Sequence, residues 1–237
     1  MNITAFDFGN TRLKMGTISN GSIENLSLCT YLDDYKDLCL KYIHDNKSEK
    51  VLVSVVNKKN YENFLTTLKL DVSFLSILSF KNFKTVYADS NSLGIDRILA
   101  MLGARKMSKK NCIVIDAGTA TTIDYIDDKF LHKGGIILPS KDMVIDAFSN
   151  RLGLTVEKKE DTVFNFLNNS THASIESGAT LCAYNNINYL IDNFIAIEGE
   201  DVDIYVTGGN ALALIDNCNY NLIHVDSLIF KGMLDII

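Results

Sequence analysis

The chain has 237 residues, 47% of them hydrophobic, which is enough for one large domain or two of ordinary size around a buried core. It carries 23 Lys and Arg against 29 Asp and Glu, a net charge of −6 without a long basic run, so we expect no nucleic-acid partner. The opening stretch MNITAFDFGN lacks a signal-peptide pattern, and no stretch approaches about 18 apolar residues. We therefore expect a cytoplasmic protein that does not bind membranes.

The first half is predicted to alternate strands and helices. The predicted strands are 3–8, 13–19, 22–28, 51–56 and 72–78. The predicted helices, from apolar residues at helical spacing, are 31–42, 61–68 and 94–107. Asn20-Gly21 predicts a tight type I′ hairpin turn, because this dipeptide tolerates positive φ angles.

The second half repeats the opening plan. Its predicted strands, ahead of two helices at 174–194 and 227–236, are 112–115, 122–126, 129–138 and 203–207. The frame D-x-G-[N/T]-[T/A] occurs at Asp7 and again at Asp116, close to half a chain length later, and internal duplication is the economical explanation. Pro139, the only proline, marks the exit from a strand, and the segment from there to Ser174 has no clear pattern.

The cysteines and histidines show no metal or disulfide pattern. The cysteines are odd in number, widely spaced and without a C-x-x-C pair, so we interpret them as buried free thiols. They are Cys29, Cys39, Cys112, Cys182 and Cys218. The histidines, which we interpret as surface or structural residues, are His44, His132, His172 and His224.

The first polar turn, DFGNTRLK at residues 7–14, follows a predicted strand. Its glycine allows a tight turn, and Asn10, Thr11 and backbone N–H groups can donate hydrogen bonds to phosphate oxygens, with Lys14 as a nearby cation. Phosphate would repel Asp7 unless a metal lay between them, so we expect Asp7 to hold Mg²⁺ through water. The alternative is an ordinary hairpin turn capped by Asp and Asn.

Two further polar turns favour phosphate binding over an ordinary hairpin turn. Gly118 and Thr119 can contact a polyphosphate, while Asp116 is a candidate cation ligand. Gly208 and Gly209 follow another predicted strand, and residues without side chains allow a flat nucleoside ring to lie against the backbone. Three such turns in order favour a nucleotide-binding cleft over three unrelated hairpins.

Six motifs, in order, resemble those of type III pantothenate kinase, a member of the acetate and sugar kinase/Hsp70/actin superfamily. They are DFGNTRLK, LGIDR, IDAGTATTID, GGIILP, ESGATLCAY and VTGGNA. The resemblance implies an α/β fold of duplicated actin-like, ribonuclease H-like domains, with mixed sheets flanked by helices and the active-site cleft between the halves. The implied domains are residues 1–109, with the first phosphate turn and the substrate motif, and residues 110–237.

The resemblance also implies an activity: ATP-dependent phosphorylation of pantothenate to 4′-phosphopantothenate, the first step of coenzyme A biosynthesis. By this resemblance, the ATP-binding residues are Asp7, Phe8, Gly9, Asn10, Thr11, Arg12, Leu13, Lys14 and Thr119. The pantothenate-binding residues are Tyr87, Gly94, Ile95, Asp96, Arg97 and Thr171, with Asp96 as the catalytic base and Arg97 as the carboxylate anchor. Asp116 is implied to hold K⁺ or NH₄⁺, and ATP is implied to bind with Mg²⁺.

The implied assembly is a homodimer, with interface surface on the helix predicted at 174–194. An apolar helical face is equally consistent with burial in the core, so the sequence leaves both explanations open. Two positions depart from the family pattern. Tyr87-Ala88-Asp89-Ser90 lacks the proline of the family's Y-x-N-P, and Ser140 stands where the family usually has glycine, which questions the shape of these two turns.

The role of Asp96 agrees with elementary chemistry. An Asp in the first turn of a helix is stabilised as the anion by the helix dipole, and a weak base suffices for a loose phosphoryl-transfer transition state. The bland alternative is a helix-capping residue beside a solvated Arg97. Two other functions also remain open: a nucleotide-binding regulatory or transcriptional accessory protein, or another small-molecule kinase of the superfamily. A regulator would not need Asp96 and Arg97, and this chain keeps both.

Overall fold

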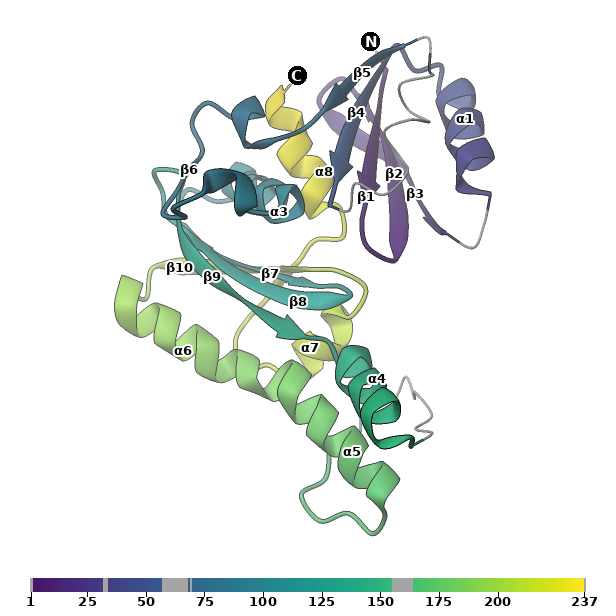
Figure 1. The fold of residues 1–237 in the computed structure, drawn as a ribbon. Helices are drawn as coiled ribbons and strands as arrows, with labels where there is room; N and C mark the ends of the chain where they lie inside the picture. The colour runs from purple at the N-terminus through teal and green to yellow at the C-terminus, as the bar shows by residue number, and fades with distance from the viewer. Residues whose placement is uncertain (1, 32–33, 57–67, 69, 155–163, 237) are drawn as a thin grey trace. The chain divides into compact units, whose positions relative to one another are not determined.

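The computed structural model describes residues 2–31, 34–56, 68, 70–154 and 164–236. The chain divides into two compact units, each with its own sheet and helices (Figure 1). The first unit comprises Met1–Lys109, Asp128–His132 and Ser227–Ile237, and the second comprises Lys110–Asp127 and Lys133–Asp226. The division into domains of residues 1–109 and 110–237 stays a prediction.

The first unit is built on a mixed five-stranded sheet with the order β3-β2-β1-β4-β5. Its strands are β1 (Ile3–Phe8), β2 (Arg12–Ser19), β3 (Ser22–Thr30), β4 (Lys50–Val55) and β5 (Asp71–Phe74). β1 pairs antiparallel with β2 and parallel with β4, and all six residues of β1 are buried, as expected for a central strand covered on both faces. Asn20 and Gly21 have φ angles of 50° and 76°, which confirms the predicted type I′ turn.

Helices cover both faces of this sheet. On one face, Cys39 and Ile43 of α1 (Tyr35–Asp45) pack with Phe6 and Phe8 of β1. On the other face, α3 (Ile95–Met107) contacts β4, and α8 (Leu228–Met233) contacts β1. Because side chains alternate along a strand, Asp7 lies on the face opposite Phe6 and Phe8, the face that α3 and α8 cover.

Two glycines allow α3 and α8 to cross closely (Figure 1). A Cβ at Gly103 would lie 2.1 Å from the carbonyl oxygen of Leu228, and a Cβ at Gly232 would lie 2.1 Å from that of Leu99. The end of α3 is also held by an ion pair of 2.7 Å between Lys106 Nζ and a carboxylate oxygen of Asp235. The predicted helices at 94–107 and 227–236 are therefore correct, and they pack backbone to backbone.

The second sheet repeats the strand order of the first. Its order is β11-β10-β7-β8-β9-β6, so that β9-β8-β7-β10-β11 corresponds to β3-β2-β1-β4-β5. The strands are β7 (Asn111–Ala117), β8 (Ala120–Ile126), β9 (Leu131–Pro139), β10 (Val202–Thr207), β11 (Ile223–His224) and the two-residue β6 (Lys84–Thr85). β6 and the first two residues of β9 group with the first unit. The matching order supports the duplication inferred from the two D-x-G turns.

One long helical stretch covers a face of the second sheet. It consists of α5 (Thr171–Thr180), a π-helical turn (Leu181–Asn185) and α6 (Asn186–Glu198). Ile187 and Ile191 of α6 pack on Ile113, Ile115 and Tyr125 of the sheet. The helix predicted at 174–194 is confirmed, and the structure extends it at both ends.

Several local predictions differ from the structure. The strand predicted at 72–78 ends at Phe74, because Ser79 Oγ accepts a hydrogen bond from the backbone N–H of Ser76 and residues 77–79 form a 3₁₀ turn. The helix predicted at 61–68 lies almost entirely outside the described residues. The sequence pattern missed α4 (Lys141–Leu152) and α7 (Ala211–Asp216). For α4 the signals were present, since Ser140 caps its start and Gly153, at φ 65°, ends it.

The cysteines are free, as predicted, but they are not all buried. Cys29, Cys39 and Cys112 are buried, whereas Cys182 is exposed on the π-helical turn. Burial, with a smaller contribution from nearby Cys29, raises the pKa of the Cys39 thiol to about 12. No helix among the described residues is long and apolar enough to cross a membrane.

Candidate active site

The first polar turn joins the buried end of β1 to β2. Asp7 is 3% exposed, and the turn after it is closed by a hydrogen bond of 3.2 Å from the Gly9 N–H to the Arg12 carbonyl oxygen. The Tyr31 hydroxyl donates to the Gly9 carbonyl at 2.8 Å and holds the turn from outside. The backbone of this turn is therefore fixed before any ligand binds, which lowers the entropic cost of binding an anion.

The side chains of the predicted ATP-binding run divide into two groups. Phe8 and Leu13 are fully buried in the core beneath the sheet, so only their backbone groups are available to a ligand. Asn10, Thr11 and Arg12 are exposed, and Lys14 is partly exposed. The exposed group contains donors and a cation, which suits a phosphate chain.

A buried hydroxyl stands beside Asp7. Parallel pairing of β1 with β4 places Asp7 opposite Ser54, and residues in register on adjacent strands project from the same face of the sheet. Ser54 is 0% exposed, and its Oγ has no hydrogen-bond partner among the described residues. A buried polar atom without a partner is costly, and it is expected to acquire one when the site is occupied.

The second and third polar turns pack against each other in the second unit. Asn210 donates from its backbone N–H to the Ala117 carbonyl at 2.9 Å and from Nδ2 to the Gly118 carbonyl at 3.1 Å. Gly208 has φ 98°, and a Cβ there would lie 2.6 Å from Asp116 Oδ1. Only glycine allows this approach, so the turns after β7 and β10 form one cluster around Asp116.

Asp116 repeats the arrangement of Asp7. It stands in register with Thr207 of the parallel strand β10, just as Asp7 stands in register with Ser54 of β4. Thr207 is 1% exposed, and its Oγ1 also lacks a hydrogen-bond partner among the described residues. Each unit thus places a carboxylate beside a buried hydroxyl at the carboxyl ends of two parallel strands. Thr119, by contrast, is exposed in its turn.

A third cluster lies at the start of α3, within the first unit. Asp96 is in the first turn of the helix, where its Oδ1 accepts a hydrogen bond of 2.8 Å from the Arg97 backbone N–H. The buried Arg97 donates from Nη1 to the Tyr87 hydroxyl at 3.2 Å, and its Cζ lies 5.7 Å from the centre of the Tyr87 ring. Three of the predicted substrate residues are therefore brought together.

The remaining predicted substrate residues have different positions. Gly94 is the N-cap of α3, and a Cβ there would lie 2.5 Å from Asp96 Oδ1. Ile95 is buried, so its backbone alone is available to a ligand. Thr171 is exposed at the first position of α5 in the second unit.

Hydrogen bonds order both segments that depart from the family pattern. Asp89 accepts a bond of 3.0 Å from the Asn91 backbone N–H and, through its carbonyl, one of 2.7 Å from the Ser92 hydroxyl, which closes a 3₁₀ turn after Tyr87. Ser140 Oγ accepts a bond of 3.3 Å from the Met143 N–H and caps α4. Side-chain hydrogen bonds thus define both turns in this chain.

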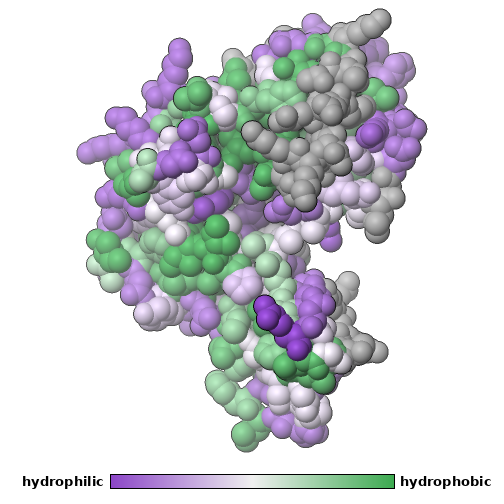
Figure 2. All heavy atoms as spheres, viewed as in Figure 1, coloured by the Kyte–Doolittle hydropathy of each residue, from purple (hydrophilic) through white to green (hydrophobic). Residues whose placement is uncertain are grey.

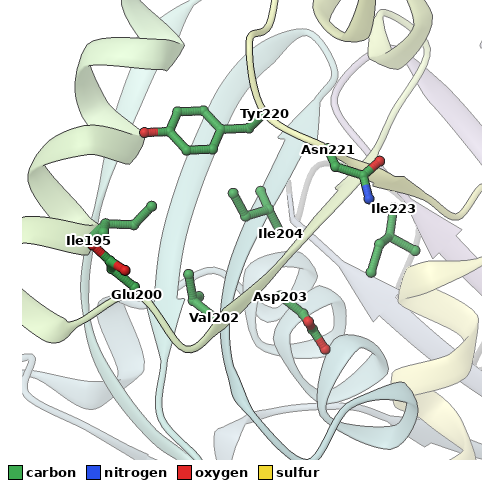
Figure 3. Close-up of a pocket in the computed structure, with 8 residues that line it drawn as sticks. All are labelled: Ile195, Glu200, Val202, Asp203, Ile204, Tyr220, Asn221 and Ile223. Carbon is green, nitrogen blue, oxygen red and sulfur yellow. The ribbon is translucent and has the colours of Figure 1, made fainter.

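A pocket of about 450 Å³ lies elsewhere in the second unit (Figure 3). Its lining includes Val202, Asp203 and Ile204 from the start of β10, together with Tyr220 and Ile223. The glycine turn follows the other end of the same strand, so this pocket contains none of the predicted site residues. Among the described residues, no three His, Cys, Asp or Glu side chains are grouped so that they could hold a metal by themselves.

The sequence patterns did not indicate Ser54 or His132, and they indicated Thr207 only as part of the third polar turn, not as a hydroxyl beside Asp116. A signal existed for Ser54 and Thr207, because each is a small hydroxyl residue in a predicted strand, in LVSVV and IYVTGG. His132 gave no signal, since the pairing of β9 with β6, strands distant in sequence, brings it to Tyr87.

Known proteins resemble this chain over most of its length. The family model described as "Type III pantothenate kinase" matches residues 3–193. A protein of that name from Flavobacterium psychrophilum is 29% identical over 218 residues, covering 88% of this chain and 87% of the relative.

Solved structures share the fold. A putative Baf family transcriptional activator from Campylobacter jejuni has a TM-score of 0.65 at 24% identity, covering 98% of this chain and 96% of the other. A putative N-acetylmannosamine kinase from Listeria monocytogenes has a TM-score of 0.56 at 14% identity, covering 100% and 98%. The predicted fold class, α/β with two mixed sheets of the actin-like ATPase and sugar kinase type, is confirmed.

Proposed function

This chain belongs to the type III pantothenate kinase family, and on that basis we propose that it transfers the γ-phosphate of ATP to the hydroxyl of pantothenate, the first step of coenzyme A biosynthesis. The observation that carries the proposal is the cluster of Asp96, Arg97 and Tyr87 at the start of α3. It combines a carboxylate base, a guanidinium that can pair with the carboxylate of pantothenate, and a phenol that orients that guanidinium.

In the proposed reaction, the hydroxyl oxygen of pantothenate forms a bond to the γ-phosphorus. The bond between that phosphorus and the bridging oxygen of ADP breaks, and the hydroxyl proton passes to the carboxylate of Asp96. The transition state is loose, so the residues contribute chiefly by positioning the hydroxyl and neutralising charge. Asp96 at a helix N-terminus is suited to this role, because the dipole favours its anion while the proton is still on the substrate.

For the triphosphate, we propose that the turn at residues 7–14 binds phosphate oxygens through its backbone N–H groups and its exposed polar side chains, and that Thr119 adds a contact. The residues present fit a hydrated Mg²⁺ that ATP brings to the site. Asp7 provides one carboxylate at a strand end, and the buried Ser54 hydroxyl beside it lacks a partner among the described residues. Mg²⁺ commonly takes one or two protein carboxylates, with phosphate oxygens and water as its other ligands. When bound, it supplies neutralisation of phosphate charge.

For a monovalent cation, K⁺ or NH₄⁺, we propose Asp116 as the ligand. Support comes from its partly exposed position at the end of β7 and from the Thr207 hydroxyl in register with it, which has no hydrogen-bond partner among the described residues. Asp116→Asn is expected to weaken the dependence of turnover on potassium. An unchanged potassium titration would exclude Asp116 as the ligand.

We further propose that the protein works in the cytoplasm as a homodimer, and that helices α5 and α6 form part of the interface. Large apolar side chains are exposed along this stretch, with Tyr189 at 67% and Ile197 at 77%, and Figure 2 shows hydrophobic residues at the surface between hydrophilic ones. Sedimentation equilibrium tests this assembly. A monomer at micromolar concentrations, with and without ATP, would contradict it.

The decisive experiment is a coupled ADP-release assay with and without pantothenate, at several potassium concentrations. We expect turnover that requires pantothenate and near-complete loss of it in Asp96→Asn, with circular dichroism unchanged. Asp37→Asn is a matched control, because Asp37 is also an acid in the first turn of a helix of the first unit, and we expect full activity. Turnover without pantothenate, or none in wild type under any condition, would refute the kinase assignment.

A further inference from the structure

His132 is a fully buried histidine on β9 that contacts the short segment leading to Tyr87. Its relative exposure is 0%, and β9 pairs parallel with β6 so that His132 stands in register with Thr85. The Val86 backbone N–H donates to the His132 carbonyl oxygen at 3.1 Å. The backbone just before Tyr87 is thus attached to the backbone of His132.

The side chain of His132 holds the same segment through a second route. Its Nδ1 is 2.8 Å from Thr85 Oγ1, and that oxygen accepts a bond of 3.1 Å from the Tyr87 backbone N–H. A hydroxyl has one proton and two lone pairs, so Thr85 can accept from Tyr87 and donate to the imidazole at the same time. The imidazole, the hydroxyl and the Tyr87 amide form one hydrogen-bonded chain.

The aromatic rings continue the contact. The Tyr87 ring lies 5.3 Å from the His132 ring at an interplanar angle of 49°, and Phe83 stacks on the same imidazole at 6.4 Å and 18°. Tyr87 also receives the hydrogen bond from Arg97 and lies beneath its guanidinium. Tyr87 is therefore held by Thr85 through its amide, by His132 through its ring, and by Arg97 through its hydroxyl and ring.

We propose that His132, acting through Thr85, is a positioning residue that sets the Tyr87 ring and thereby the Arg97 guanidinium for the carboxylate of the acceptor. This rests on the proposed function, in which Tyr87 and Arg97 contact pantothenate. A histidine that served only the core would be expected to affect folding stability alone. Here the Thr85 hydroxyl links the imidazole to the Tyr87 amide, and the imidazole ring also contacts the ring of Tyr87, a residue of the acceptor site.

The test uses steady-state kinetics of the full-length protein, varying pantothenate and ATP separately. Thr85→Val keeps the side-chain shape and removes the hydroxyl, and we expect the KM for pantothenate to rise about five-fold, since one hydrogen bond is lost. His132→Ala should raise it about ten-fold, and His132→Asn, whose amide can replace Nδ1, about two- to three-fold. The kcat and the KM for ATP should stay within about two-fold.

A mutant cycle shows whether His132 acts through Tyr87. In a Tyr87→Ala background, Thr85→Val and His132→Asn should have no further effect on the KM for pantothenate. The matched control is Thr17→Val in β2, which removes another buried hydroxyl, 3.2 Å from the Tyr42 hydroxyl. It should lower stability without changing that KM. Unchanged KM in Thr85→Val and His132→Ala, or equal effects with and without Tyr87, would overturn the proposal.

Amide hydrogen exchange gives a readout that needs no activity. In Thr85→Val, exchange of the Tyr87 amide should become faster, because its acceptor is gone, while the Val86 amide, which donates to the His132 backbone, stays protected. Unchanged exchange at Tyr87 would contradict the hydrogen-bonded chain. Wild-type turnover separates the two proposals: no pantothenate-dependent turnover in wild type refutes the function, whereas active wild type with unaffected variants refutes only the role of His132.

Discussion

Replacing Gly94 by alanine should disable Asp96 without unfolding α3. Gly94 has φ −55° and ψ 134°, angles that alanine adopts without strain. The added Cβ, however, would lie 2.5 Å from Asp96 Oδ1, whereas ordinary contacts begin at 3.4 Å. Either the carboxylate rotates away or the start of the helix shifts, and the oxygen must move by about 0.9 Å.

The expected magnitude follows from this displacement. A misplacement of about 1 Å at a reacting group can cost about 100-fold in rate, so kcat should fall by about two orders of magnitude. The free energy of unfolding should change little. Alanine is a poorer N-cap than glycine by about 0.5–1 kcal/mol, and the side chain of Asp96 can rotate to relieve the contact.

The assay is the coupled ADP-release measurement, combined with thermal denaturation and with the KM for ATP. The double variant Gly94→Ala/Asp96→Asn provides the control, because a substitution that acts only by displacing Asp96 should add nothing to Asp96→Asn. Two results would refute the reasoning: a kcat for Gly94→Ala within about three-fold of wild type, or a loss of activity matched by an equal loss of ATP binding.

Three further predictions concern packing, metal and pH. Gly103→Ala should lower the free energy of unfolding in urea by at least about 2 kcal/mol, because its Cβ would lie 2.1 Å from a backbone oxygen of α8. Gly178→Ala, whose Cβ would meet no other atom within 4 Å, is the control and should be neutral or stabilising. Equal effects of the two substitutions would contradict the close helix crossing. Ser54→Ala should raise the Mg²⁺ concentration needed for half-maximal turnover about three- to ten-fold. It should also weaken Mn²⁺ binding to the ADP complex, measured by electron paramagnetic resonance. If neither quantity changes, Ser54 does not contribute to metal binding. The pKa of Cys39 is raised from 9.0 to about 12, so the stability that the buried neutral thiol contributes is complete below pH 9 and is lost as the pH rises toward 12. The free energy of unfolding should therefore fall by about 1–2 kcal/mol from pH 8.5 to 10.5, and by less in Cys39→Ala. An identical pH profile in Cys39→Ala would contradict this cause.

Local chemistry made much of the fold predictable. The strand at 3–8 and the helix starting after Gly94 agree with the structure because a short, mainly apolar run and a period-3.6 apolar pattern are properties of contiguous residues. The turn at Asn20-Gly21 was equally accessible, since its dihedral angles depend on two adjacent residues. In two of the failed predictions a side chain replaces a backbone partner: the serine hydrogen bond that follows the strand ending at Phe74, and the Ser140 cap that begins α4.

The residues of the candidate site also divide into those that a local sequence pattern predicts and those that it does not. Motif residues such as Asp7, Asp96 and Asp116 were found in the sequence because each belongs to a short run with a recognisable turn or helix start. The positions of Ser54 and Thr207 beside the carboxylates were not found, because strand pairing distant in sequence creates them.

The sequence by itself determined most of the elements, the internal duplication and the chemical character of three polar turns, because these depend on residues near each other along the chain. Only the tertiary structure decided which groups distant in sequence meet: Ser54 beside Asp7, the glycine backbones where α3 and α8 cross, and His132 in contact with Tyr87. The physical reason is that strand register and helix crossing are set by packing summed over many residues. No local pattern encodes which side chain a given carboxylate or phenol will meet.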